Sequence, residues 1–303
     1  MVVAQYLLAF REVLEAALLS AIILAFLTRT GRAALTRYAW YGILGAIAAS
    51  LVLGTVVFLI YGQVTGAAKP LFEGIAALVA VAVLTSMILW MALKGRLLKQ
   101  EIETRVEAAV TRNAVFGLAA VTFVLVAREG LETVLFLTPY LTEDPLGTLG
   151  GSAAGVVAGT ALAYGVFRLG VKLDIRRFFY FTSLLLVLIA GGLVGYGIHE
   201  LIEAGAMQGV DFGVWGEPAY ALPIASDSLL GHKGAIGSIF AVMFGYTVKP
   251  EWARVIGHAA YLAVALPLVV LIYRRPQTLA RFARRVRALF RPSAGNATAS
   301  RNP

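Results

Sequence analysis

Seven stretches of the chain are apolar over a length that suits the crossing of a lipid bilayer. A bilayer core about 30 Å thick requires roughly 20 consecutive, mostly apolar residues in a helix. The pattern therefore predicts an all-α integral membrane protein with seven transmembrane helices. The windows cover residues 3–28, 40–62, 71–93, 114–140, 150–168, 178–200 and 256–273.

The first window differs from a removable signal peptide. It carries Arg11, Glu12 and Glu15 in its middle, and no clear small-residue cleavage pattern follows it. A signal peptide has a short uncharged apolar core before such a cleavage site. We therefore expect this window to remain as the first membrane helix.

Three segments outside the windows need separate interpretation. Residues 94–112 place apolar positions at helical spacing among charges, which fits either a short amphipathic helix or, as the preferred interpretation, a solvated connector. Residues 201–255 form a long outer segment whose apolar part, 234–248, is too short for a span and is interpreted as re-entrant or interfacial. Residues 276–303 form a basic amphipathic tail suited to an anionic membrane surface, with a disordered end.

Composition supports lipid as the solvent of most of the chain. Hydrophobic residues make up 59% of the sequence and charged residues 14%, with a mean hydropathy of +0.81. The chain has no cysteine, so a disulfide framework and a thiolate metal site are both excluded. Metal binding in this chain must use oxygen or imidazole ligands.

The positive charge of the chain is explained by membrane topology and not by nucleic-acid binding. The net charge is +9, and most of the 26 basic residues fall in the segments after windows one, three, five and seven. Cytoplasmic loops carry an excess of lysine and arginine, so the N-terminus is predicted outside and the C-terminus in the cytoplasm. Arginine-rich loops and alanine-rich spans favour a multi-pass protein of the cell (cytoplasmic) membrane.

A charged motif occurs twice within the apolar windows. Arg11-Glu12-Val13-Leu14-Glu15 in the first window recurs as Arg128-Glu129-Gly130-Leu131-Glu132 in the fourth. The predicted topology gives these two spans opposite directions, which fits inverted repeats of three helices. We therefore divide a permease domain of residues 1–275 into repeat one (1–94), repeat two (113–200), the outer segment (201–255) and helix seven (256–273).

The two motifs carry unbalanced charge. Helical geometry turns both glutamates of a motif toward the face of its arginine, and ionised side chains in mid-membrane are costly unless partnered. A purely structural clamp between spans one and four is one explanation, but four glutamates against two arginines leave a deficit of positive charge. A hard cation bound by carboxylate oxygens would fill it, and protons on some glutamates are the competing answer. The candidate ligands are Glu12, Glu15, Glu129 and Glu132, with Arg11 and Arg128 as supporting ion pairs.

Further acidic and imidazole groups lie near the predicted outer ends of the spans. Glu73, at the start of span three, is either a relay ligand or a residue that reaches the membrane interface. His199 and Glu203 are four residues apart at the end of span six and could share a cation, although ordinary solvation is the simpler interpretation. We include both groups as candidate metal ligands, the second as an outer capture site.

Paired Arg-Glu-x-x-Glu motifs in the first and fourth of seven spans resemble the oxidase-dependent iron transporter family, which includes fungal high-affinity iron permeases and bacterial EfeU-type permeases. Phe72-Glu73-Gly74, His199-Glu200-Leu201 and Phe244-Gly245-Tyr246 add to the resemblance, which covers nearly the whole chain. It implies that the four motif glutamates carry iron and that Glu73 contributes. It also implies that a separate iron-delivery or oxidase protein acts on the outer face. The large extracytoplasmic domain of some relatives has no counterpart in this sequence.

The sequence thus predicts an iron permease that imports Fe²⁺ or Fe³⁺, with iron as the transported substrate and no tightly bound cofactor. A transporter of another hard cation, such as Mn²⁺, or a proton-coupled carrier is the first alternative. A membrane carboxylate metalloenzyme is the second, but di-iron bundles use Glu-x-x-His motifs, and the three histidines of this chain form none.

Overall fold

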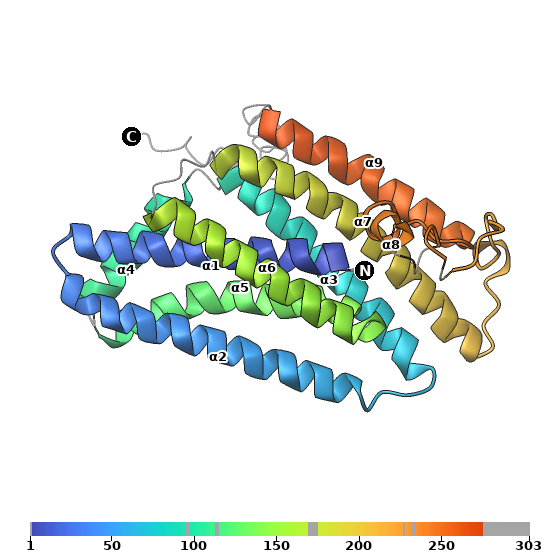
Figure 1. Cartoon of the computed structure of the whole chain (residues 1–303), viewed down its shortest axis with the longest axis horizontal. Helices are drawn as coiled ribbons and strands as arrows, with labels where there is room; N and C mark the ends of the chain where they lie inside the picture. Colours follow the sequence, from blue (N-terminus) through green and yellow to red (C-terminus); the bar gives the residue numbers. More distant parts are fainter. Residues whose placement is uncertain are drawn as a thin grey trace, which may run out of the picture.

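The computed structural model describes residues 2–94, 97–112, 115–168, 175–226, 228–231, 234 and 236–274. Within these ranges the chain is helical, and the regular strand pairing is limited to one bridge between Pro218 and Glu251 (Figure 1). The α-helices are α1 (Val2–Arg29), α2 (Thr36–Tyr61), α3 (Ala68–Lys94), α4 (Leu98–Arg112), α5 (Phe116–Glu143), α6 (Pro145–Arg168), α7 (Ile175–Met207), α8 (Gly237–Phe244) and α9 (Trp252–Arg274), with short 3₁₀ turns at Ala33–Leu35 and Gly213–Trp215.

Every predicted apolar window falls on a long helix. Among the described residues, five helices are long and apolar enough to cross a membrane, namely α2, α3, α6, α7 and α9. The helices α1 and α5 are not among these five, and they are the two that carry the Arg-Glu-x-x-Glu motifs. The prediction of an all-helical membrane protein is confirmed, and charged residues interrupt the apolar runs of α1 and α5 in mid-helix.

The long helices pack mainly in three pairs. Helix α1 lies against α6, α2 against α5, and α3 against α7, while α9 covers α7. Glycine permits the closest of these contacts, because a Cβ atom on Gly42 of α2 would lie 2.5 Å from the carbonyl oxygen of Ala119 on α5. On α6, a stripe of glycines at every fourth position, Gly151, Gly155 and Gly159, faces α1 in the same way. Small residues at helix contacts are typical of membrane bundles.

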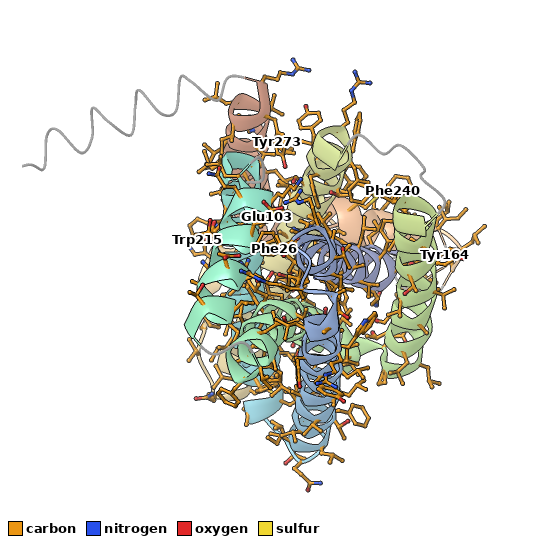
Figure 2. All side chains as sticks on the ribbon, turned by 90° about the vertical axis from the view of Figure 1, so that its left-hand side faces the viewer. Phe26, Glu103, Tyr164, Trp215, Phe240 and Tyr273 are labelled. Atoms are coloured by element: carbon orange, nitrogen blue, oxygen red, sulfur yellow. The ribbon has the colours of Figure 1, made fainter. Side chains whose placement is uncertain are left out.

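The bundle has an apolar core and an apolar periphery. Leu8, Leu84, Phe136 and Ile189 are fully buried where α1, α3, α5 and α7 meet. Large apolar side chains also project outward, among them Leu51 of α2, which is 68% exposed. Figure 2 shows Tyr164 and Phe240 at the outside of the bundle, where both are more than half exposed. An apolar periphery of this kind suits contact with lipid.

The preferred interpretation of residues 94–112, a solvated connector, is wrong. Residues Leu98–Arg112 form α4, and the buried side chains Ile102 and Val106 pack against the ends of α1 and α5. Two surface ion pairs hold α4 to the α1–α2 connection, Arg29 with Glu103 and Arg32 with Glu107, each at 2.7 Å. The hydrogen bond from Arg32 holds the pKa of Glu107 below its usual range. The amphipathic alternative is therefore the correct one.

The outer segment differs from the prediction mainly at its beginning. Helix α7 continues to Met207, so the expected end of this helix at residue 200 was seven residues too early. Among the described residues of the apolar stretch 234–248, the helical part is the eight-residue α8, in agreement with the expectation that this stretch is no span. Figure 1 shows this segment and α4 at opposite ends of the bundle. The predicted tail, 276–303, lies outside the described residues.

Candidate metal centre

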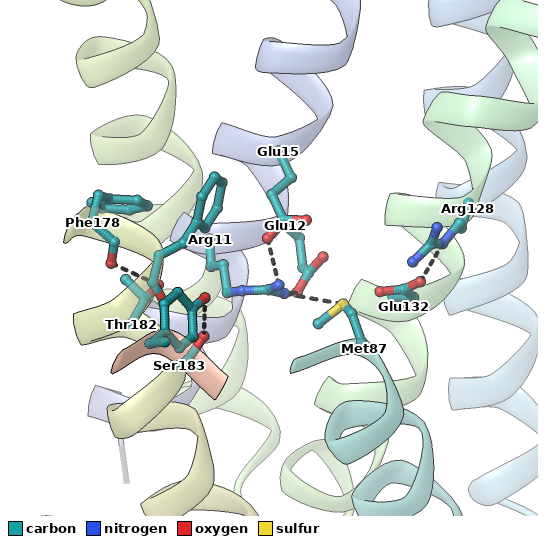
Figure 3. A network of polar contacts seen from close by, with 11 residues as sticks. Arg11, Glu12, Glu15, Met87, Arg128, Glu132, Phe178, Thr182 and Ser183 are labelled. Carbon is teal, nitrogen blue, oxygen red and sulfur yellow. Dashed lines mark hydrogen bonds and ion pairs between the residues drawn. The ribbon is translucent and has the colours of Figure 1, made fainter. Parts of the chain in front are cut away.

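The first copy of the motif forms a buried ion-pair cluster on α1. The Arg11 guanidinium is 2% exposed and contacts Glu12 at 2.6 Å and Glu15 at 2.5 Å (Figure 3). Its Nη1 atom also donates a hydrogen bond of 3.2 Å to the sulfur of Met87 on α3. Positions one and four residues after the arginine place both carboxylates within its reach on one helix. Arg11 therefore neutralises one of the two charges beside it.

The second copy, on α5, is built differently. Arg128 uses Nε to bind Glu132 at 2.7 Å, and its side chain is 44% exposed (Figure 3). The Arg128 guanidinium lies over the Trp90 ring of α3, 5.0 Å from its centroid, which is a cation–π contact. Glu129 is buried, and no described residue donates a hydrogen bond to its Oε2 atom. The two arginines are thus not equivalent.

Three of the four motif glutamates converge. Oxygen atoms of Glu12, Glu15 and Glu129 lie within 4.8 Å of one another, and all three residues are buried. Glu132 is buried too and interacts electrostatically with Glu12 and Glu15, but Arg128 occupies one of its oxygens. The Oε2 atoms of Glu12, Glu129 and Glu132 have no hydrogen-bond donor among the described residues.

This arrangement fits a hard cation. Among the described residues, these three carboxylates form ion pairs with one guanidinium, that of Arg11, which leaves a formal excess of two negative charges if all are ionised. Isolated buried charge costs several kcal/mol, so it requires a proton or a metal ion as compensation. Carboxylate oxygens without donors are the ligands that a hard divalent or trivalent ion prefers. The cluster can therefore hold a metal ion between α1 and α5.

The one difference between the motif copies has a steric cause. A Cβ atom on Gly130 would collide with the hydroxyl of Ser50 on α2, so α5 requires glycine here. At the corresponding position of α1, Val13 packs against Gly159 of α6, whose own Cβ atom would come within 3.2 Å of the valine. Each helix pair thus has a glycine at the contact. In the α5–α2 pair the glycine belongs to the helix that carries the motif, and in the α1–α6 pair it belongs to the other helix.

Comparisons with known proteins identify the family of the chain. The model of the iron permease FTR1 family matches residues 2–275. The chain belongs to this family. A protein of Archaeoglobus fulgidus whose function is uncharacterised is 45% identical over 271 residues, covering 89% of this chain and 95% of its own length. Proteins named ferrous iron permease EfeU from Escherichia coli O6:H1 and Yersinia pestis are 35% and 32% identical, covering 91% of this chain and 98% and 94% of their own lengths. No solved structure matches.

Membership in the FTR1 family makes the chain a multi-pass membrane transporter of iron and not an enzyme. The metalloenzyme alternative is thereby excluded. The paired motifs of the permease lie on the two helices that its apolar composition alone does not identify as spans.

A second polar group of the permease lies near the N-terminal end of α3. Glu73 is 7% exposed and accepts hydrogen bonds from Tyr61 of α2 at 2.6 Å and Tyr196 of α7 at 2.9 Å. The Glu200 carboxyl lies within hydrogen-bonding reach of Glu73. Both carboxyls line a cavity of about 870 Å³.

His199 and Glu203 line the same cavity. His199 Nδ1 bonds Glu251 at 2.7 Å, and its Nε2 atom faces Glu203 at 3.8 Å. Ligand atoms of His199, Glu200 and Glu203 lie within 4.8 Å of one another. Burial alone would raise the pKa of Glu251, but the hydrogen bond and charge of His199 outweigh burial and hold this pKa below its usual range.

This cavity and the glutamate cluster are separate. Glu73 and Met87 are fourteen residues apart on α3, which corresponds to about 21 Å along a helix. The α3 side chains between them, including Ala77, Ala80 and Leu84, are fully buried in the apolar core. The predicted candidates therefore fall into two groups that the described conformation does not connect.

Some residues of these groups were not predicted. Tyr61 and Tyr196 donate hydrogen bonds to Glu73. Glu251 pairs with His199, and the Trp90 ring contacts the Arg128 guanidinium. Only Tyr196 had a local signal, because it is four residues before Glu200 on one helix. Tyr61, Trp90 and Glu251 lie in other segments of the chain than their partners, and no spacing in the sequence connects them.

Proposed function

We propose that this permease imports iron across the cell (cytoplasmic) membrane and that Glu12, Glu15 and Glu129 bind the ion in transit. The observation that carries this proposal is their convergence: three buried carboxylates within 4.8 Å of one another, served by one buried guanidinium. Glu132 becomes a further ligand when its bond to Arg128 breaks. The 44% exposure of the Arg128 side chain favours this step. Two relatives are named ferrous iron permeases, so Fe²⁺ is the substrate form that we propose.

The proposed topology has seven spans, with α1, α2, α3, α5, α6, α7 and α9 crossing the membrane, the N-terminus outside and the C-terminus in the cytoplasm. The inverted repeats are α1–α3 and α5–α7. The helix pairing supports them, because exchanging the repeats converts the α1–α6 contact into the α5–α2 contact and leaves α3–α7 and α1–α5 unchanged. A two-fold relation between repeats produces this exchange.

Single cysteines can test the topology without background, because the chain has no cysteine. Thr30→Cys lies between α1 and α2, and Gln63→Cys lies between α2 and α3; both positions are exposed. A membrane-impermeant maleimide added to intact cells should label Gln63→Cys and should label Thr30→Cys only after permeabilisation. The reverse pattern would invert the proposed orientation.

In the proposed topology the cavity lined by Glu73, His199 and Glu203 lies on the outer side, and we refer to it as the outer cavity. It is the proposed capture site for arriving iron. In its support, the cavity is large and partly lined by carboxylates, and Glu251 orients the imidazole of His199 as carboxylates do for metal-binding histidines. Delivery by a separate iron-delivery or oxidase protein on the outer face stays a prediction from the family resemblance.

Uptake of radioactive Fe²⁺ into proteoliposomes tests the central cluster. Glu12→Gln, Glu15→Gln and Glu129→Gln should each lower uptake by at least about tenfold, because each removes a charged ligand from a buried site. Glu103→Gln, which removes a partly exposed carboxylate of α4, is the matched control and should leave uptake nearly unchanged. Wild-type uptake in all three correctly inserted cluster variants would reject the site, and equal competition by Mn²⁺ would favour the broader hard-cation transporter.

A further inference from the structure

Helix α4 covers the glutamate cluster on the side away from the outer cavity. Along α3, Glu73 lies in the outer cavity, Met87 contacts Arg11, and Met91 lines a second, small cavity that α4 closes. The apolar face of α4, with Ile102 and Val106, packs on the ends of α1 and α5. Figure 1 shows α4 at the end of the bundle where α1 and α2 are joined.

The small cavity links the cluster to α4. It measures about 50 Å³, enough for a few water molecules, and Glu15, Glu129 and Arg128 line it from the bundle. Glu101 and Arg105 line it from α4. The Glu129 side chain is 5% exposed, and its carboxylate lines this cavity. The Oε2 atom of this carboxylate is buried and has no hydrogen-bond donor among the described residues. One continuous space therefore connects two ligands of the cluster with a carboxylate of α4.

We propose that α4 is the inner gate of the permease and that Glu101, released from Arg105, is the carboxylate that iron meets on leaving the cluster. This inference rests on the proposed function, because it takes Glu15 and Glu129 as ligands of the ion. It adds an exit residue and a moving element that the paired motifs do not include.

The ion pairs of α4 suit a gate that opens. Glu101 binds Arg105 at 2.6 Å, with side chains 37% and 56% exposed. Exposed pairs of this kind contribute little, so an approaching cation can displace Arg105 at small cost. By contrast, the pairs of Arg11 are buried and costly to break. The mobile charge pair thus lies on α4, and the fixed one lies in the cluster.

Cross-linking tests the gate. Arg29→Cys and Glu103→Cys replace a pair that joins the end of α1 to α4, in a chain that has no cysteine of its own. A short bifunctional thiosulfonate reagent joins the two thiols through disulfides that a reductant removes. We expect cross-linking to lower Fe²⁺ transport through proteoliposomes by at least about tenfold and the reductant to restore it, because a closed gate blocks passage. Each single-cysteine variant with the same reagent is the control and should keep its transport rate.

Glu101→Gln tests the exit carboxylate. It should lower transport about tenfold while equilibrium Fe²⁺ binding to the purified permease changes less than about threefold, since the ligands of the cluster remain. Glu103→Gln removes a carboxylate of the same helix outside the cavity and should change transport by less than threefold. A Glu101→Gln variant that transports as well as Glu103→Gln would remove Glu101 from the path.

The outcomes separate this inference from the proposed function. Full transport in the verified cross-linked protein would overturn the gate and leave the cluster untouched. Failure of the proposed function would instead appear as Fe²⁺ binding that Glu12→Gln, Glu15→Gln and Glu129→Gln do not weaken. Loss of transport together with loss of binding on cross-linking would mean that the reagent distorts the cluster, and would also contradict a gate that acts only on exit.

Discussion

The unequal burial of the two motif arginines predicts unequal effects on stability. Arg11 is 2% exposed and holds both Glu12 and Glu15, so Arg11→Met leaves two buried carboxylates without their cation. Removing one partner of a buried ion pair costs about 3–5 kcal/mol. Arg128 is 44% exposed and binds Glu132 alone, so Arg128→Met should cost only about 1 kcal/mol, including its contact with Trp90.

Thermal unfolding of the purified permease in detergent measures this difference. For a chain of this size, 1 kcal/mol corresponds to roughly 2–4 °C in Tm, so Arg11→Met should lower Tm by roughly 6–20 °C and Arg128→Met by roughly 2–4 °C. The double variant Arg11→Met/Glu15→Gln should recover part of the loss, because it also removes one unpaired charge.

Two results would refute this reasoning. Equal Tm shifts in the two arginine variants would mean that the motif copies share one environment, contrary to their exposure. A double variant no more stable than Arg11→Met would mean that the loss comes from packing against Met87 and not from uncompensated charge.

Two further predictions concern packing and pH. Gly130→Val should lower Tm, at a cost of about 1–3 kcal/mol, because its side chain collides with Ser50; adding Ser50→Gly should restore part of the loss, and no coupling between the two changes would contradict the close contact. The pKa of Glu251 lies below its ordinary value of about 4.5 because Glu251 pairs with His199. The pair therefore stabilises the folded protein above about pH 4.5, and this stabilisation is lost as the pH falls through the lower pKa of the folded state. Tm of His199→Gln should therefore fall less between pH 6 and pH 4 than that of the wild type, and parallel curves would contradict the pair.

The membrane helices were predictable because lipid imposes a simple rule. A span requires a continuous apolar run, so each window falls on a helix even where charges interrupt it. The ends were less certain: α6 begins at Pro145, five residues before its window, and α7 continues seven residues beyond residue 200. Helix ends depend on the loops and partners that follow, which hydropathy does not contain.

The amphipathic pattern of α4 was recognised but wrongly interpreted. Ile102 and Val106 at helical spacing are compatible with a membrane surface, a solvated connector or a packed helix. The structure decides between them, because the same side chains are buried against Leu19 and Ile23 of α1. The sequence contains the apolar face but does not identify the surface that covers it.

The sequence predicted the residues of the candidate site, but it did not predict that they form two separate groups. The spacing of each motif places its arginine and glutamates on one face of a helix, so the approach of Glu12, Glu15 and Glu129 follows once α1 meets α5. The inequality of Arg11 and Arg128 does not follow, because it arises from Met87 and Trp90, two neighbours on α3. Two nearly identical motifs thus have different electrostatic environments, because α3 presents Met87 to one arginine and Trp90 to the other.

This asymmetry supports a direction for the proposed transport path. The buried Arg11 holds Glu12 and Glu15 in place, whereas Arg128 lines the small cavity beside Glu129 and is partly exposed, so its bond to Glu132 is the easier one to break. A site with one rigid wall and one movable wall releases its ion on the movable side. That side is the one that faces α4, so the inequality of the arginines and the position of the proposed gate lead to the same exit.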